Sequence, residues 1–472
     1  MPAPTNGSNR ARLHRTLGVT DLVFLNICAI LGIRWLSTAA QMGPSSLVLW
    51  VLAVLIYFIP SGFTVRELSS RDSGEGGVYR WTKSAFGELH AFVAGWTYWV
   101  NNLVYFPSLL LFIAGTFLFV GGDAWLGLGE SGWYNAAFSL TLLWIIIGAN
   151  VVGLKRGKWI QNIGAMATVT VFLVLAVSGI WAWTMVGSAT DFAASSLAPS
   201  LTDFSTLTFF ATMTFAFAGL ELSSTMGDEI VDPARSIPRA MVISGLIVTS
   251  IYILGTGLLM VALPEGEIDV VTGIAQALSV TGDRIALPGL AVVGTILVVM
   301  SATGVLAAWL AGAARMPYVI GIDRYLPEAL GRTHSKWGTP HVALITQGVV
   351  VTVLMLAAVA GSTIEEANIM LLDMAIILYF IPFLYMFAAL PVLRRKAQGR
   401  NEGVSLVPGG TAGLWCVSFL GFTATLLSVA LALIPPAGTE NPKLFMIKVA
   451  GGCALFIVAG LSFYFHGHKR TT

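Results

Sequence analysis

Charged residues are scarce in this sequence. Only 11% of its 472 residues are Asp, Glu, Lys or Arg, whereas 56% are hydrophobic. A single soluble core could not bury so large a share of apolar side chains. The formal net charge is only +2, and no basic domain or arm is present that could follow a phosphate backbone, so we expect no nucleic-acid partner. The mean hydropathy of +0.80 indicates instead a lipid bilayer as the surrounding solvent.

Cysteine and histidine are also rare. The three cysteines, Cys28, Cys416 and Cys453, lie within apolar segments, where we expect them to pack as small hydrophobic residues and to form no disulfide framework. All six histidines lie in tails, in loops or at the ends of apolar segments, so no buried histidine dyad or histidine-rich metal site can form. We therefore expect no enzyme, no cofactor and no bound metal. A channel is also disfavoured, because the sequence has no repeated filter loop.

Long apolar segments, by contrast, recur along the whole chain. A helix needs roughly 20 apolar residues to cross about 30 Å of hydrocarbon. The sequence predicts an all-α integral membrane protein with twelve transmembrane helices. The predicted helices cover residues 18–41, 45–64, 91–120, 134–152, 163–186, 203–226, 240–263, 285–311, 342–360, 367–392, 411–433 and 444–465.

The distribution of Lys and Arg predicts the orientation of these helices. With residues 1–17 as a cytoplasmic tail, only Arg284 and Lys443 fall in outer loops, which is the bias that the positive-inside rule requires. Lys448 lies near the outer end of the last helix and can extend to the interface. The pattern predicts a multi-pass protein of the plasma (inner) membrane with both termini cytoplasmic. Arg34 then remains as the basic residue deep within a span.

Two spans break the rules for membrane helices in the same way. The first contains Gly32 followed two residues later by Arg34, and the sixth contains Gly219 followed two residues later by Glu221. An arginine at that depth costs on the order of 3 kcal/mol. Paired interruptions in corresponding halves indicate a transporter binding site, because broken helices expose backbone N–H and C=O groups. The alternative is that both glycines only allow helices to pack closely.

From this pattern we predict the residues of a site. The predicted substrate-binding residues are Ile30, Leu31, Gly32, Ile33 and Arg34 in the first span and Ala216, Phe217, Ala218, Gly219 and Glu221 in the sixth. The predicted gating or cavity-lining residues are Trp35, Tyr98, Trp309, Asp373 and Tyr379. Asp373 fits a water-exposed vestibule as well as a proton relay. We expect Arg34 and Glu221 to face one cavity and to influence each other directly or through water, since each is costly in a dry environment.

Three segments between spans carry a family resemblance. Residues 74–81 read Gly-Glu-Gly-Gly-Val-Tyr-Arg-Trp, residues 229–240 contain Asp-Pro-Ala-Arg-Ser-Ile-Pro-Arg, and residues 315–327 run from Arg-Met-Pro-Tyr to Asp-Arg-Tyr-Leu-Pro. They resemble the amino acid–polyamine–organocation superfamily, and the similarity extends from Leu17 to Arg395. Residues 58–62 are similar to the glutamate/γ-aminobutyrate antiporter branch.

The resemblance implies a fold and a division of the chain. Residues 18–392 would form a ten-helix core of two inverted five-helix repeats, the LeuT-like arrangement, with substrate between the broken first and sixth helices. Residues 393–472 would add two transmembrane helices and a cytoplasmic C-terminus. The expected function is secondary active transport of an amino acid, neutral or acidic, by alternating access, as an exchanger or a proton-coupled symporter. The expected partners are this small-molecule substrate, the lipid bilayer and, if transport is coupled, protons.

The sequence departs from the family pattern at two positions. Family members resemble one another in a Gly-Ser-Gly break, whereas this chain has Gly32-Ile33-Arg34. Some proton-coupled members have a fifth-helix lysine in place of a sodium ion, and Thr168 occupies that position here. Arg34 would then supply a fixed positive charge instead of a cation, or hold a substrate carboxylate. A polyamine or amine transporter and a non-transporting substrate sensor remain as alternatives.

Overall fold

The computed structural model describes residues 15–199, 204–269, 273–287, 289–361, 364–398, 407–435 and 441–471. Within these ranges it is helical apart from loops and one isolated bridge between Leu17 and Ile230. Among the described residues, ten helices are long and apolar enough to cross a membrane, so the chain is a multi-pass membrane protein. They cover Ser45–Arg71, Glu88–Gly121, Gly132–Val152, Gly157–Val186, Pro233–Ala262, Leu290–Gly321, His341–Ala360, Met370–Lys396, Gly410–Leu431 and Pro442–Gly467.

Two further apolar helices are interrupted. Helix α1 (Val19–Ile30) and helix α2 (Arg34–Ala40) are bent by 43° relative to each other at the break between them. Helix α10 (Phe204–Ala216) ends before Gly219, and the chain resumes as the short helix α11 (Leu222–Thr225). The predicted discontinuities near Gly32 and Gly219 are therefore confirmed.

All twelve predicted segments fall on helices, but several bounds differ. The helix predicted from residue 163 begins at Leu154, and the one predicted from residue 240 begins at Pro233. Four short helices, α5, α7, α13 and α15, were not predicted, because they are too short or too amphipathic to resemble spans. The other helices are α3 (Ser45–Ala53), α4 (Ile59–Arg71), α5 (Val78–Phe86), α6 (Glu88–Phe117), α7 (Asp123–Leu126), α8 (Gly132–Val152), α9 (Leu154–Val186), α12 (Pro233–Ala262), α13 (Gly273–Arg284), α14 (Leu290–Ala313), α15 (Arg315–Ile322), α16 (His341–Gly361), α17 (Ile364–Gln398), α18 (Gly410–Leu431) and α19 (Pro442–Thr471).

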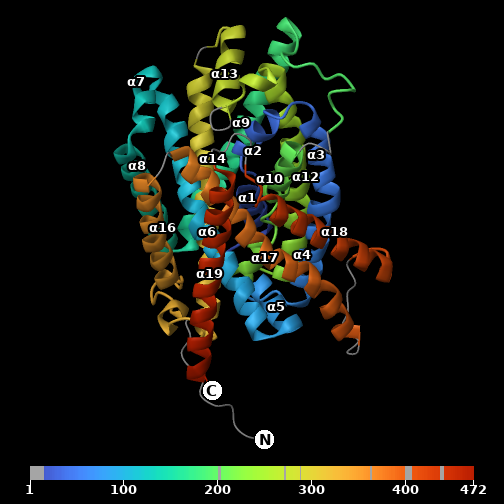
Figure 1. Cartoon of the computed structure of the whole chain (residues 1–472), viewed down its shortest axis with the longest axis vertical. Helices are drawn as coiled ribbons and strands as arrows, with labels where there is room; N and C mark the ends of the chain where they lie inside the picture. The colour runs from blue at the N-terminus through green and yellow to red at the C-terminus, as the bar shows by residue number, and fades with distance from the viewer. Residues whose placement is uncertain are drawn as a thin grey trace, which may run out of the picture.

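The broken helices lie at the centre of the bundle (Figure 1). Helix α1 packs against α9, α12 and α14, and α6 packs against α14 and α17. Helices α8 and α16 flank one side and α18 the other, while α5 lies at one end and α7 and α13 at the opposite end (Figure 1). In the most apolar stretch of the span that contains α6, 78% of the residues are buried, whereas the corresponding share for the span of α19 is 22%. Helix α6 is thus a core element, and α19 presents most of its surface to lipid.

Candidate functional site

A small cavity of about 30 Å³ lies between the two helix breaks, with room for about two water molecules in this conformation. Its walls come from α1, α2, α6, α10, α14 and α17, together with Ala218 in the break after α10. The lining residues are Ala29, Ile30, Gly32, Trp35, Asn101, Asn102, Tyr105, Phe215, Ala216, Ala218, Val305, Trp309 and Tyr379.

The first break is held open by side chains that bond its backbone. The indole Nε1 of Trp309 donates to the carbonyl of Ala29 at 3.0 Å, one turn before the break. Gly32 leaves room for the ring of Trp35, because a Cβ at Gly32 would lie 2.5 Å from the indole Nε1. A side chain at position 32 would therefore displace Trp35, which lines the cavity.

The second break is pressed directly against the first. Gly219 has φ +130°, a conformation that side chains disfavour. A Cβ there would also lie 2.9 Å from the carbonyl oxygen of Ala29. Both the positive φ and the close approach to the Ala29 carbonyl require glycine. Gly219 therefore combines the two interpretations offered by the sequence, a helix break and close packing of helices.

Glu221 is satisfied within the protein. Its carboxylate is fully buried and accepts hydrogen bonds from the hydroxyl of Tyr98 at 3.1 Å, from the backbone N–H of Gly219 at 3.1 Å, and from the hydroxyl of Tyr379. Tyr379 also lines the cavity, so the carboxylate lies one side chain behind the cavity wall. Three donors to one carboxylate offset much of the penalty of burying it.

Arg34 is held differently. Its guanidinium lies 4.3 Å from the ring centroid of Trp35, 5.2 Å from that of Tyr105 and 6.0 Å from that of Phe112. Nη1 donates to the Ser108 hydroxyl at 3.3 Å, while Nε and Nη2 are buried without a hydrogen-bond partner. Cation–π contacts supply part of the missing compensation.

A direct Arg34–Glu221 ion pair is not formed. The ion pairs among the described residues do not include it, and neither side chain belongs to the cavity lining. The two charges are instead compensated separately, by tyrosines at Glu221 and by aromatic rings at Arg34. The expectation that both face the cavity is corrected accordingly.

The remaining predicted site residues divide into two layers. Seven line the cavity, namely Ile30, Gly32, Trp35, Ala216, Ala218, Trp309 and Tyr379, and the others, including Leu31, Ile33, Phe217, Gly219 and Tyr98, lie behind it. Asp373 also lies outside the lining, and its neighbour Met374 packs against Gly452 of α19. Sequence reasoning missed Asn101, Asn102 and Tyr105. The adjacent asparagines within an apolar span were the available signal.

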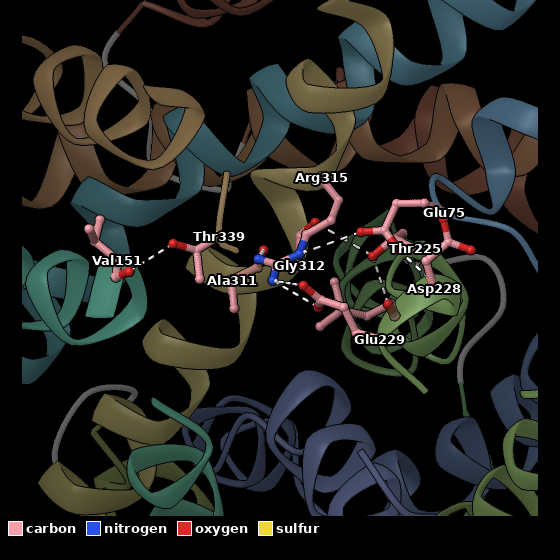
Figure 2. A network of polar contacts seen from close by, with 10 residues as sticks. Glu75, Val151, Thr225, Asp228, Glu229, Ala311, Gly312, Arg315 and Thr339 are labelled. Atoms are coloured by element: carbon pink, nitrogen blue, oxygen red, sulfur yellow. Dashed lines mark hydrogen bonds and ion pairs between the residues drawn. The ribbon is translucent and has the colours of Figure 1, made fainter. Parts of the chain in front are cut away.

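A buried ion cluster, which we call the inner seal, joins the segments that carried the family motifs. Figure 2 shows Arg315 between Glu75 and Glu229. Its Nη2 donates to both carboxylate oxygens of Glu229 at 2.8 Å, and its Nε lies 3.6 Å from Glu75. The backbone N–H of Asp228 donates to the other oxygen of Glu75 at 3.1 Å. Burial and the neighbouring Glu229 raise the pKa of Glu75 well above its usual value, and Arg315 only partly opposes this.

Glycines bring the backbones at the inner seal together. The N–H of Gly76 donates to the carbonyl of Thr225 at 3.0 Å. A Cβ at Gly227 would lie 1.8 Å from the carbonyl oxygen of Ser73. The start of α1 joins the same region, because the N–H groups of Thr16 and Leu17 donate to the carbonyl of Glu229. The ends of both broken helices are thus bound together on the side of α5.

The comparisons with known proteins assign the family. The family model for amino acid permeases matches residues 17–458. The chain belongs to the amino acid permease family, which confirms the resemblance to the amino acid–polyamine–organocation superfamily.

Three relatives match more than four fifths of the chain. An uncharacterized transporter of Legionella pneumophila is 28% identical over 94% of this chain and 95% of its own length. A probable agmatine/putrescine antiporter of Lactococcus lactis is 23% identical over 92% of this chain and 91% of its own length. A glutamate/γ-aminobutyrate antiporter of the same species is 21% identical over 82% of this chain and 77% of its own length. The relatives are transporters.

One solved structure defines the fold class. The crystal structure of MhsT in complex with L-phenylalanine superposes with a TM-score of 0.63 at 15% identity, covering 89% of this chain and 100% of that chain. At this level of identity the likeness concerns the fold alone, and it supports the all-helical LeuT-like architecture.

Proposed function

We propose that this amino acid permease transports a neutral or acidic amino acid across the plasma (inner) membrane by alternating access, as an exchanger or a proton-coupled symporter. Two broken helices that meet at one small cavity support the proposal most directly. Counting the bent pair and the short α10–α11 pair as spans gives twelve, with both termini cytoplasmic. Residues 18–392 would form the ten-helix core of two inverted repeats, and residues 393–472 the two additional helices.

The chemistry of the first break favours an anionic group. The carbonyl of Ala29 accepts from Trp309, and that of Ile30 accepts from Tyr252 at 2.6 Å. These acceptors are therefore occupied before any amine arrives. The unpartnered Nε and Nη2 of Arg34 remain as donors behind Trp35 and Tyr105. A carboxylate could be held bidentately by a guanidinium once these rings move aside.

The inner seal supports the alternating-access part of the proposal. It ties together the α5-side ends of both broken helices through Glu75, Glu229 and Arg315. Glu221, held by Tyr98 and by the cavity-lining Tyr379, directly precedes α11 on the chain path from the second break to Glu229. In this conformation the cavity would be shut toward the cytoplasm, and breaking the seal would open it.

A polyamine or amine substrate is the second candidate, and one observation favours it. Glu221 is a buried carboxylate one side chain from the cavity, and it would attract a cation that displaced Tyr379. Because Arg34 repels cations from the same region and is the less satisfied of the two charges, we favour the amino acid.

Counterflow in liposomes tests the proposal. Purified protein is reconstituted, the liposomes are loaded with unlabelled compound, and uptake of labelled L-glutamate, L-serine, putrescine and agmatine is compared. We expect uptake of L-glutamate or L-serine and none of putrescine or agmatine. Selective putrescine or agmatine uptake would establish the amine alternative. A thermal shift with ligand but no flux of any compound would indicate a sensor.

A further inference from the structure

A single tyrosine contacts both helix breaks from outside the cavity lining. Tyr252 lies on α12 and is fully buried. Its hydroxyl accepts a hydrogen bond from the N–H of Gly32 at 3.2 Å. The same oxygen lies 2.6 Å from the carbonyl of Ile30 at the first break and 3.1 Å from the carbonyl of Ala216 at the second.

The ring of Tyr252 is fixed by its neighbours. It stacks on Trp50 with centroids 4.4 Å apart and planes 6° from parallel, and Phe217 meets it edge-on at 5.1 Å. The indole of Trp50 is itself anchored, because its Nε1 donates to the hydroxyl of Thr256 at 3.0 Å. The hydroxyl therefore occupies a fixed point to which both breaks must adjust.

A tyrosine hydroxyl has one hydrogen, but two carbonyl acceptors share it here. It can donate fully to only one of them at a time. The hydroxyl oxygen lies closer to the carbonyl oxygen of Ile30 than to that of Ala216, so Ile30 is the main acceptor of the hydrogen in this conformation. A buried carbonyl that loses its donor is penalised, so movement of one break changes the hydrogen bonding of the other.

We propose that Tyr252 is a positioning residue that couples the two helix breaks, its hydroxyl passing one hydrogen bond between Ile30 and Ala216 as the breaks rearrange. The inference rests on the proposed function and extends it to a residue that does not touch the substrate. It explains why a polar group is buried in α12 at the one point where the backbones of α1 and α10 both end.

Hydrogen–deuterium exchange on the purified full chain tests the coupling without any substrate. Tyr252→Phe keeps the packed ring and removes only the hydroxyl. We expect amide exchange in residues 27–35 and 214–222 to rise about tenfold in both segments, the size of effect that an unsatisfied buried group produces. The control is Tyr57→Phe, another fully buried tyrosine packed on Phe380, which should leave both segments unchanged. Faster exchange at only one break, or at neither, would overturn the inference.

Two further measurements separate this inference from the proposed function. In counterflow of labelled L-glutamate and of L-serine, Tyr252→Phe should lower the maximal rate about tenfold with a smaller change in KM, and an unchanged rate would contradict coupling. If the wild type exchanges neither compound, the proposed substrate class fails while the hydrogen-exchange result still stands. If Tyr252→Phe does not fold, Thr256→Val, which loosens the Trp50 stack, should raise exchange at both breaks by a smaller factor. No rise at either break would count against the inference.

Discussion

Arg34 and Arg315 are both buried, yet their guanidinium groups have opposite surroundings. Arg315 is 1% exposed, forms a two-oxygen contact with Glu229 and lies beside Glu75. Arg34 is 7% exposed and has one hydrogen bond and three aromatic neighbours, but no carboxylate. A charge with its own counter-ions holds segments together, whereas a charge without them retains capacity for a ligand.

The difference follows from where each arginine lies along the chain. Arg315 begins α15 at the end of the α14 span, where the loops that carry Glu75 and Glu229 can reach it. Arg34 begins α2 in the middle of a span, where its neighbours are aromatic, and the buried carboxylate of the second break, Glu221, already accepts from Tyr98, Tyr379 and Gly219. Depth in the membrane therefore separates a structural ion cluster from a candidate recognition group.

The largest expected effect comes from removing the paired arginine. Arg315→Met takes away the guanidinium that compensates two buried carboxylates, and breaking such a pair costs about 3–5 kcal/mol. We expect the free energy of unfolding, measured by denaturant titration in mixed micelles, to fall by that amount. The matched control is Arg324→Met, whose ion pair with Glu328 is 66% and 74% exposed and should contribute about 0–1 kcal/mol. Equal stability of the two variants would show that the inner seal is not structural.

Removing Arg34, the arginine without a counter-ion, should affect transport more than stability. Arg34→Met keeps the packing against Trp35 and Tyr105 and removes a charge with two unpartnered nitrogens, so stability should change little. The kcat/KM for L-glutamate counterflow should instead fall about 10- to 100-fold, as expected for a lost charge-assisted hydrogen bond. Arg34→Lys should restore it only in part, because an ammonium cannot bind bidentately. Unchanged L-glutamate uptake in Arg34→Met would show that the arginine does not bind the substrate.

The inner seal should also respond to pH through Glu75. The raised pKa of Glu75 means that the folded protein binds a proton that the unfolded chain, with a carboxyl near its usual 4.5, has already released. The stabilisation by this proton is present below the usual value and is lost as pH rises through the raised folded value. Asp228 and Glu229 raise that pKa, Arg315 lowers it, and Tyr318 also faces Glu75.

We therefore expect wild-type stability to decline with increasing pH above about 4.5, by at most about 1.4 kcal/mol per unit for one proton. Glu75→Gln, which mimics the protonated carboxyl, should flatten this dependence. Unfolding titrations at several pH values on both proteins measure it. Parallel pH profiles would mean that Glu75 is ionised in the folded protein.

The sequence alone was sufficient to predict the apolar spans and the helix breaks, but not the groups that compensate the buried charges of Arg34 and Glu221. Hydropathy located all twelve apolar segments, and Gly32 and Gly219 marked the discontinuities, because a glycine beside a charge is rare in lipid. Apart from the adjacent Trp35 and Gly219, the partners of Arg34 and Glu221 come from α6 and α17, far away in the chain, and no local pattern specifies them. Tyr252 resembles any other intramembrane tyrosine in sequence. Its role depends on two carbonyl groups that only the tertiary structure brings together.

The smallest expected effect concerns cations at Thr168, the position that the family resemblance aligns with a lysine or a sodium ion. The hydroxyl oxygens of Thr168 and Ser301 lie 2.5 Å apart, and the Thr168 hydroxyl donates to the carbonyl of Gly164 at 2.9 Å. This close contact leaves no room for a cation between the two hydroxyls. Counterflow should therefore proceed at the same rate when sodium chloride is replaced by choline chloride. Thr168→Val should lower the free energy of unfolding by only about 0.5–1.5 kcal/mol. A rate that depends on sodium in the wild type and not in Thr168→Val would instead show that the two hydroxyls separate to bind the ion during transport.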